Sequence, residues 1–343
     1  MKREIVVFGY FGYTKNKLDG QTVKTRSILE LLNKNEVDNI TYIDSPELRF
    51  SLLYILNSFI KIIRCKKLVY IPAHNSLKYI LPIFFIFSFI FNFKIYYFVV
   101  GGWLIEFLKK NKKHVFLLKN IELILPETQI VCNELINEFN FKNVRNFPNF
   151  RKGKNFIPSL KKVNAPIKLV YLGRIQEKKG ISVILKLAKI LLERNIDVVI
   201  DLYGQVDESY NEFLFTKLKS LHNINYKGSL LPEDIYGRLD EYDLMLFPTK
   251  YYTEGLPGTI LDAYMSGIPV VATNWKHAKE FIDENITGII SNFNKELEFI
   301  DSVISLLNNP EKINEMKKSA YKKSFNFSET KAQNIIREIF FNK

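Results

Sequence analysis

The second half of the chain alternates short apolar runs with amphipathic stretches, and this alternation restricts the fold more than any other feature. In chain order the runs and stretches occupy residues 168–172, 181–194, 198–203, 208–221, 224–227, 244–247 and 268–272. The short runs have the length of strands, and the longer stretches have helical spacing. Strands that alternate with helices form a parallel sheet with helices on both faces. Ligands of such sheets bind beyond the carboxyl ends of the strands, so the residues that follow each run are candidates for a site.

The first half of the chain shows the same alternation. We expect strands at 5–8, 40–43, 68–71, 94–100, 121–125 and 143–147, and helices at 21–32, 51–67, 79–93 and 129–139. At 343 residues the chain exceeds what one hydrophobic core usually holds. The sequence therefore predicts two α/β domains.

A glycine-rich loop lies between two acidic residues in the second half. Gly255 and Gly258 allow the backbone to approach a ligand closely, and a helix beginning near Thr259 presents N–H groups that favour an anion. Glu254 in the loop and Asp262 on the helix are eight residues apart, so they can hold different parts of one ligand. The alternative is an ordinary strand–helix turn with two solvated acids.

A second segment places two cations at the end of a strand. The strand at 168–172 ends in Gly173, and Arg174 and Lys179 follow it. An arginine and a lysine at the carboxyl end of a strand provide a planar fork and a point charge that suit a diphosphate. Each cation alone would be an ordinary solvated surface group.

Taken together, the two segments resemble the donor site of glycosyltransferase family 4. The resemblance rests on Gly-Arg-x4-Lys-Gly from Gly173 and on Glu-x7-Asp from Glu254, which follows Lys179 by 75 residues. It is specific over residues 168–327 and looser before them. It implies the GT-B fold, in which two Rossmann-like parallel-sheet domains face an interdomain cleft, and a nucleotide-sugar-dependent transferase that retains the configuration of the sugar.

The resemblance also implies a division of the chain. Residues 1–150 form the acceptor- and membrane-facing domain, and residues 151–326 form the donor-binding domain. The segment 146–150, NFPNF, is similar to the family's hinge, and a charged linker follows it. Residues 327–343 form a C-terminal helix that crosses back to the first domain.

The resemblance assigns roles to the acids and cations. Glu254 binds hydroxyl groups of the donor sugar, and Asp262, in place of the family's longer glutamate, binds the ribose. Arg174 and Lys179 stabilise the departing diphosphate, so the expected catalytic residues are Glu254, Arg174 and Lys179. The other donor-binding residues that it implies are Gly20, Gln21, Gly173, Gly204, Ser229, Leu230, Gly255, Leu256, Pro257, Gly258 and Thr259, with Asp19 and Thr22 in the same loop as Gly20.

Three further residues are expected near the acceptor and the transferred sugar. Family members often carry a histidine at the end of the strand predicted at 94–100, where this chain has Gly101 and Gly102. The backbone of these two glycines is the expected substitute. His74 follows the preceding strand and either contacts ligand or is a hydrogen-bonded structural group.

No metal ion or cofactor is expected, since the chain contains no Asp-x-Asp triplet and the nucleotide sugar is a substrate. Two cysteines, Cys65 and Cys132, are too few for a disulfide framework and pair with no histidine as metal ligands do. A reducing cytoplasm is the simplest setting.

The positive charge is concentrated in the first half. The net charge is +13, and residues 1–150 hold 21 basic against 12 acidic residues, a net of +9. Within 48–120 the count is 12 basic residues to one acidic residue, Glu106, beside the most apolar runs of the chain, 50–63 and 80–93. Cations beside apolar helices suit an anionic membrane surface better than nucleic acid.

The run 80–93 is too short to cross a bilayer. Its 14 residues would extend about 21 Å as a helix, against a hydrocarbon core of about 30 Å. It forms either a buried helix of an α/β layer or a helix that lies on the membrane. A further helix, expected after Gly101 and Gly102, ends in Lys109, Lys110, Lys112 and Lys113, which face either lipid headgroups or water.

These observations favour a cytoplasmic glycosyltransferase, peripheral on the inner face of the cell membrane. It would move a sugar from a UDP-sugar to a lipid-linked or surface-polysaccharide glycan. Two alternatives remain, a nucleotide-sugar epimerase of the same fold and a non-catalytic membrane-associated adaptor.

Overall fold

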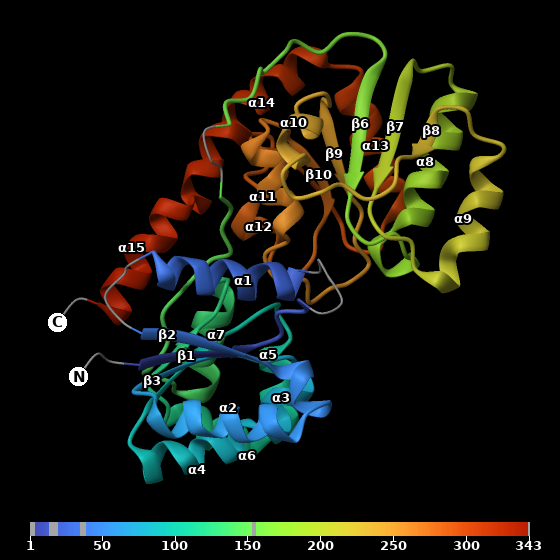
Figure 1. The fold of residues 1–343 in the computed structure, drawn as a ribbon. Helices are drawn as coiled ribbons and strands as arrows, with labels where there is room; N and C mark the ends of the chain where they lie inside the picture. The colour runs from blue at the N-terminus through green and yellow to red at the C-terminus, as the bar shows by residue number, and fades with distance from the viewer. Residues whose placement is uncertain (1–3, 14–19, 35–38, 153–155, 342–343) are drawn as a thin grey trace. The chain divides into compact units, whose positions relative to one another are not determined.

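The structure is a computed structural model that describes residues 4–13, 20–34, 39–152 and 156–341 (Figure 1). The chain forms two compact units. The first contains residues 1–149 and 330–343, and the second contains residues 150–329. The C-terminal segment therefore belongs to the same unit as the N-terminal strands.

The first unit is built on a five-stranded parallel sheet. Its strands are β1 (Glu4–Gly9), β2 (Asn39–Asp44), β3 (Lys67–Ile71), β4 (Lys94–Phe98) and β5 (Leu123–Leu125), in the spatial order β2-β1-β3-β4-β5. In the inner strand β1, Val7 lies opposite Tyr42 of β2 and Val69 of β3. Both faces of this strand are buried, as is typical of parallel sheets that helices cover on both sides.

Helices cover both faces of this sheet. They are α1 (Gly20–Asn33), α2 (Leu52–Arg64), α3 (His74–Tyr79), α4 (Leu81–Phe91), α5 (Leu104–Lys110), α6 (Lys112–Lys119), α7 (Gln129–Phe139) and α15 (Glu329–Phe340), with a 3-10 turn at Ser45–Arg49. Helices α1 and α15 lie on one face, and α2, α4 and α6 lie on the other (Figure 1). The last turn of α15 is fixed by Phe340, whose ring lies 4.6 Å from that of Tyr96 and whose carbonyl accepts a hydrogen bond from Lys67.

Two of the expected helices have other bounds in the structure. The helix expected at 79–93 is α4, which begins at Leu81 with Pro82 in its first turn, and the short helix α3, which was not expected, precedes it. The lysines expected at the end of one helix lie on two, since Asn111 adopts a non-helical conformation between α5 and α6. Lys112 and Lys113 therefore begin α6.

Residues 143–147, expected as a strand, do not form one in the structure. Only Val144 forms a bridge, with Ile124. The neighbouring strand β5 ends before Pro126, which has no N–H to extend the ladder. The first sheet consequently has one strand fewer than the sequence predicted.

The second unit is built on a six-stranded parallel sheet. Its strands are β6 (Ile167–Leu172), β7 (Val198–Tyr203), β8 (Ile224–Tyr226), β9 (Leu244–Phe247), β10 (Val270–Thr273) and β11 (Gly288–Ser291), in the order β11-β10-β9-β6-β7-β8. The edge strand β11 was not predicted.

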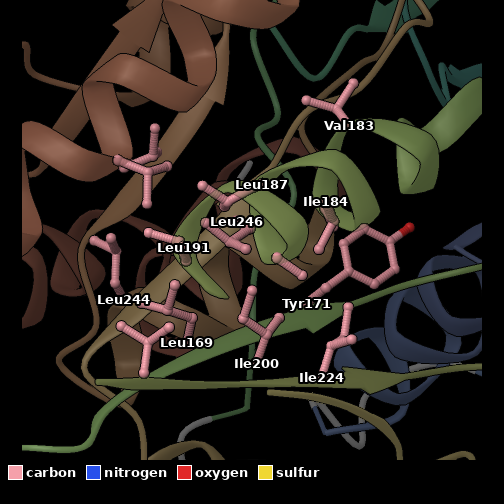
Figure 2. Close-up of a cluster of buried hydrophobic side chains, with 14 of the residues drawn as sticks. Leu169, Tyr171, Val183, Ile184, Leu187, Leu191, Ile200, Ile224, Leu244 and Leu246 are labelled. Atoms are coloured by element: carbon pink, nitrogen blue, oxygen red, sulfur yellow. The ribbon is translucent and has the colours of Figure 1, made fainter. Parts of the chain in front are cut away.

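The central strand β6 shows why helices cover both faces of this sheet. Leu169 and Tyr171 face one hydrophobic cluster, whereas the alternate residues Val170 and Leu172 face another. Figure 2 shows the first cluster, in which side chains from β6, β7, β8 and β9 meet α8. The helices of this unit are α8 (Ile181–Glu193), α9 (Asn211–Leu218), α10 (Ile235–Leu239), α11 (Gly258–Met265), α12 (Ala278–Phe281), α13 (Glu296–Leu307) and α14 (Pro310–Ser324), with 3-10 turns at Glu177–Lys179, Glu208–Tyr210 and Phe325–Phe327.

Candidate functional site

The loops that leave the second sheet meet closely at its carboxyl edge. The N–H of Gly173 donates to the carbonyl of Tyr203 at 3.0 Å, and that of Gly204 donates to the carbonyl of Gly228 at 2.8 Å. A Cβ on Gly204 would lie 1.9 Å from the carbonyl oxygen of Gly173. Glycine is therefore required at Gly204 for the two loops to pack. Gly173 and Gly204, both predicted as donor residues, lie together.

The two predicted cations follow β6 in one short loop. Arg174 is exposed, and its carbonyl accepts a hydrogen bond from the hydroxyl of Tyr171 at 2.8 Å. Lys179 ends a 3-10 turn, and Gly180 begins α8 with a φ of +78°. A Cβ on Gly180 would lie 1.8 Å from the carbonyl oxygen of Pro248, so the loop packs directly against the segment that follows β9.

Lys179 and Glu254 form an ion pair. The ammonium Nζ lies 2.6 Å from Oε1 and 2.9 Å from Oε2 of the carboxylate. The side chains of Lys179 and Glu254 are 22% and 14% exposed, so solvent reaches the pair only in part. The structure thus brings together two residues that are 75 positions apart and that the sequence predicted in one site. The pair offers a cation for an anionic ligand and a carboxylate for hydroxyl groups.

A buried tryptophan holds the loop that carries Glu254 in place. The indole N–H of Trp275 donates to the carbonyl of Gly255 at 3.3 Å, and this tryptophan is 1% exposed. Leu256 and Pro257 are buried as well. Helix α11 begins at Gly258, and the preceding Pro257 supplies no side-chain cap to its first turn. The half-buried Thr259 follows.

Asp262 is paired with a residue that the sequence did not single out. Nε and Nη2 of Arg151 donate to the two carboxylate oxygens at 2.7 and 3.3 Å. The half-buried Tyr236 lies beside the same carboxylate. Burial, and then the negative charge of Asp262, raise the pKa of Tyr236. Arg151 therefore holds the carboxylate to which the sequence assigned the ribose.

The segment predicted to contact the base follows β8. Gly228 has a φ of +80°, and the exposed Ser229 comes after it. Leu230 packs against the cluster that contains the even-numbered residues of β6. The segment lies at the same carboxyl edge as the glycines of β6 and β7.

In the first unit, the predicted residues also gather at the carboxyl edge of the sheet. Gly20 begins α1, and the side-chain amide of Gln21 donates to the carbonyl of Ile71, at the end of β3. Asp19 lies outside the described residues. The exposed His74 begins α3, and its ring centre lies 5.0 Å from that of Trp103.

A buried ion pair organises the loop after β4. Gly101 has a φ of +82°, and its N–H donates to Oε2 of Glu127 at 3.0 Å, whereas Gly102 is buried. Oε1 of Glu127 accepts from Nζ of Lys24 at 2.6 Å, and the same ammonium donates to the carbonyl of Val99 at 3.2 Å. Burial lowers the pKa of Lys24, and the charge of Glu127 opposes that effect.

Sequence reasoning missed Lys24, although a signal was present. Lys24 precedes Ile28 by four residues and Leu31 by seven, so it lies on the buried face of α1. A lysine on such a face needs an acidic partner. That partner, Glu127, follows β5.

Two other features of the described residues bear on ligand binding. A cavity of about 220 Å³ in the second unit is lined by Val183, Pro248, Thr249, Lys250, Thr273, Asn294, Lys295, Glu296 and Phe299, which include no residue predicted from the sequence. Among the described residues, no three histidine, cysteine or acidic side chains gather as metal ligands would.

The sequence and the fold have known relatives. Residues 153–323 match the family model described as "Glycosyl transferases group 1". An uncharacterized glycosyltransferase of Haemophilus influenzae is 23% identical over 312 residues, which cover 87% of this chain and 76% of the relative. An uncharacterized 41.2 kDa protein in the cps region of Klebsiella pneumoniae is 27% identical over 139 residues, or 40% of this chain and 36% of that protein.

A solved structure extends the likeness to the whole chain. Anabaena Alr3699/HepE in complex with UDP-glucose has a TM-score of 0.74 at 15% identity, and the match covers 98% of both chains. The two parallel sheets with covering helices described above match that structure. The match over residues 153–323 shows that this chain belongs to the glycosyl transferases group 1 family, and the likeness to the solved structure shows that it has the GT-B fold.

Proposed function

We propose that the protein transfers a sugar from a UDP-sugar to a lipid-linked or surface-polysaccharide glycan, with retention of configuration and without a metal ion. The observation that carries this proposal is the ion pair between Lys179 and Glu254, placed between the loop after β6 and the start of α11. In a family of glycosyltransferases, a cation and a carboxylate so placed suit the diphosphate and the hydroxyl groups of one donor.

The chemistry follows from the charges that develop during transfer. A departing nucleoside diphosphate gains negative charge, which Lys179, Arg174 and the N–H groups at the start of α11 stabilise. Glu254 then exchanges its bond with Lys179 for hydroxyl groups of the sugar. Attack on the same face of the sugar, assisted by the leaving phosphate, retains the configuration and needs no protein nucleophile.

Two similarities support the donor and the acceptor. The HepE structure holds UDP-glucose, which favours a uridine donor here. The Klebsiella relative lies in a cps region, which favours a surface glycan as acceptor. Gly101, Gly102 and His74, at the carboxyl edge of the first sheet, are the residues proposed to contact that acceptor.

The first unit also carries an apolar face that suits a membrane. Helix α4 packs on α2 through Phe59 and Phe87 and on α6 through Phe85 and Phe116. Leu81, Phe84 and Phe85 of α4 are buried, yet its other side is exposed. Large exposed side chains on these three helices, here called the apolar face, are Leu52, Leu53, Leu56, Ile83, Ile86, Phe89, Ile90 and Phe116.

Basic residues lie on the helices of the apolar face and on the neighbouring α3. Arg64, Lys78, Lys112, Lys113 and Lys119 are exposed. Exposed apolar side chains with cations on the same and adjoining helices match the interior and the headgroups of an anionic bilayer. We therefore propose peripheral binding to the inner face of the cell membrane. None of the described helices is both long and apolar enough to span a bilayer.

Nucleotide binding tests the donor site. Thermal unfolding is measured with UDP, GDP, ADP, CMP and UDP-sugars for the wild type, Lys179→Met and Glu254→Gln, with the exposed neighbour Lys178→Met as control. A ligand at a hundred times its dissociation constant should stabilise the fold by about 2.7 kcal/mol. We expect Lys179→Met to lose the shift with UDP while Lys178→Met keeps it. A wild type that responds to no nucleotide would contradict the proposal.

Vesicle co-sedimentation tests the membrane. Replacing Leu53, Ile86 and Phe89, which are 79%, 57% and 70% exposed, with glutamine should weaken binding to vesicles that contain phosphatidylglycerol. The matched control replaces three equally exposed residues of the second unit, Ile157, Leu231 and Leu297. Replacing Lys112 and Lys113 with glutamine should have a smaller, salt-dependent effect. Equal binding of the apolar variant and its control would rule out this surface.

A further inference from the structure

Arg151 is fixed at both its backbone and its side chain. Its N–H donates to the carbonyl of Phe327 at 3.0 Å, and the residue forms a bridge with Ser328. Its guanidinium donates two hydrogen bonds to Asp262, from Nε and Nη2, and Nη1 donates to the carbonyl of Phe150 at 3.2 Å. The side chains of Arg151 and Asp262 are only 17% and 5% exposed. A two-bond contact of this kind sets both the position and the plane of the guanidinium.

The guanidinium lies against the start of α11. A Cβ on Gly258, the first residue of the helix, would lie only 1.6 Å from Nη2 of Arg151. Gly258 thus leaves the space that the guanidinium fills. A cation next to a helix N-terminus is unfavourable unless an anion offsets it. Asp262, in the second turn, provides one such anion, and a diphosphate at the helix N-terminus would provide another.

The pairing changes what Asp262 can do. Both of its oxygens accept hydrogen bonds from Arg151, and the half-buried Tyr236 lies beside it. An aspartate is one methylene shorter than a glutamate, and this one is 3% exposed. Direct contact with two ribose hydroxyls would break the bonds to Arg151. The position of the Asp262 carboxylate therefore favours its bonds to the Arg151 guanidinium over contact with the ribose.

We propose that Arg151 is a donor-binding residue, which contacts the phosphates of the nucleoside diphosphate, and that Asp262 positions it. A guanidinium has five N–H donors in a planar fork, so it can hold a carboxylate on one edge and a phosphate on another. In Arg151 the edge formed by Nε and Nη2 holds Asp262, and the phosphate would bind at the edge formed by Nη1 and Nη2, beside the carbonyl of Phe150. Arg151 would then join Lys179 and Arg174 as the third cation of the site. This inference rests on the proposed function of the second unit.

Calorimetric titration separates the phosphate from the rest of the nucleotide. UDP, 2′-deoxy-UDP and uridine are titrated into the wild type, Arg151→Met, Arg151→Lys and Asp262→Asn, with Arg194→Met, an exposed arginine of the same unit, as control. We expect Arg151→Met to lose about 10-fold or more in affinity for UDP and nothing for uridine. Arg151→Lys should lie between the two, and the wild type should bind 2′-deoxy-UDP nearly as well as UDP.

Each opposite result has a definite meaning. Unchanged or tighter UDP binding by Arg151→Met would show that Arg151 does not contact the phosphates. The inference would be overturned if the wild type bound 2′-deoxy-UDP much more weakly than UDP and Asp262→Asn bound the two equally. That result would show that Asp262 contacts the ribose. If Arg151→Met does not fold, Arg151→Lys and Asp262→Asn decide the question. A wild type that binds no nucleoside diphosphate would overturn the proposed function as well.

Discussion

The buried pair between Lys24 and Glu127 gives a sharp prediction for stability. Their side chains are 1% and 3% exposed, and Nζ lies 2.6 Å from Oε1. Lys24→Met leaves the carboxylate buried with the N–H of Gly101 and without its cation. Removing one partner of a buried pair costs about 3–5 kcal/mol, because the remaining charge stays desolvated. We expect the free energy of unfolding of the first unit to fall by that amount.

The two tryptophans make the measurement specific to one unit. Trp103 lies in the first unit and Trp275 in the second. In a Trp275→Phe background, the fluorescence of Trp103 reports urea unfolding of the first unit alone. With an m-value of about 2 kcal/mol/M, the expected loss moves the midpoint by roughly 1.5–2.5 M. The double variant Lys24→Met/Glu127→Gln should be more stable than Lys24→Met, since it removes the unpaired charge.

A surface pair supplies the control. Lys94 and Glu122 lie 2.8 Å apart in the same unit, but their side chains are 60% and 38% exposed. Lys94→Met should cost less than about 1 kcal/mol, because water screens an exposed pair. If Lys24→Met costs no more than Lys94→Met, the argument from burial is wrong.

Two further predictions concern the second unit, with Trp275 as reporter in a Trp103→Phe background. Gly180→Ala should destabilise this unit by about 2 kcal/mol or more, because the φ of Gly180 is +78° and a Cβ would lie 1.8 Å from the carbonyl oxygen of Pro248. The control Gly237→Ala should be nearly neutral, because a Cβ there meets nothing within 4 Å. Equal effects of the two substitutions would contradict the reasoning. Burial, and then the charge of Lys276, lower the pKa of His277 to about 4. The unfolded chain, with a pKa near 6.5, takes up the proton first, so stability is complete above about pH 6.5 and falls by up to about 3 kcal/mol as the pH drops to about 4. His277→Phe should flatten that slope in urea titrations at several pH values, and an unchanged slope would assign the pH dependence to other groups.

The helices and strands were predictable from the sequence where the apolar pattern was long or had clear ends. The helix expected at 129–139 and the strands expected at 198–203 and 244–247 have those bounds in the structure. Apolar runs that contain a proline were harder. Pro82 lies in the first turn of α4, which begins at Leu81 and not at 79, and Pro126 directly follows β5, beside which 143–147 forms only a bridge. The hydrophobic pattern alone does not show where a proline lacks the backbone N–H that a helix or strand uses.

The candidate site was predictable in its residue types but not in its pairings. The spacing of Lys179 and Glu254 pointed to one site, and the structure places them in contact. The partners of Asp262 and Gly101 lie 111 and 26 residues away in the chain, at Arg151 and Glu127. Such contacts depend on which strand ends are neighbours, and a single sequence does not supply that order.

The most direct test of the proposed reaction follows both products by ¹H NMR. The wild type and Glu254→Gln are incubated with the UDP-sugar selected by the binding panel and with a lipid-linked glycan fraction. The proposal predicts UDP release and a new glycosidic anomeric signal with the configuration of the donor, only when the acceptor is present and only with the wild type. Conversion of the donor without any acceptor would instead indicate an epimerase, and no release of UDP under either condition would contradict the proposed transfer.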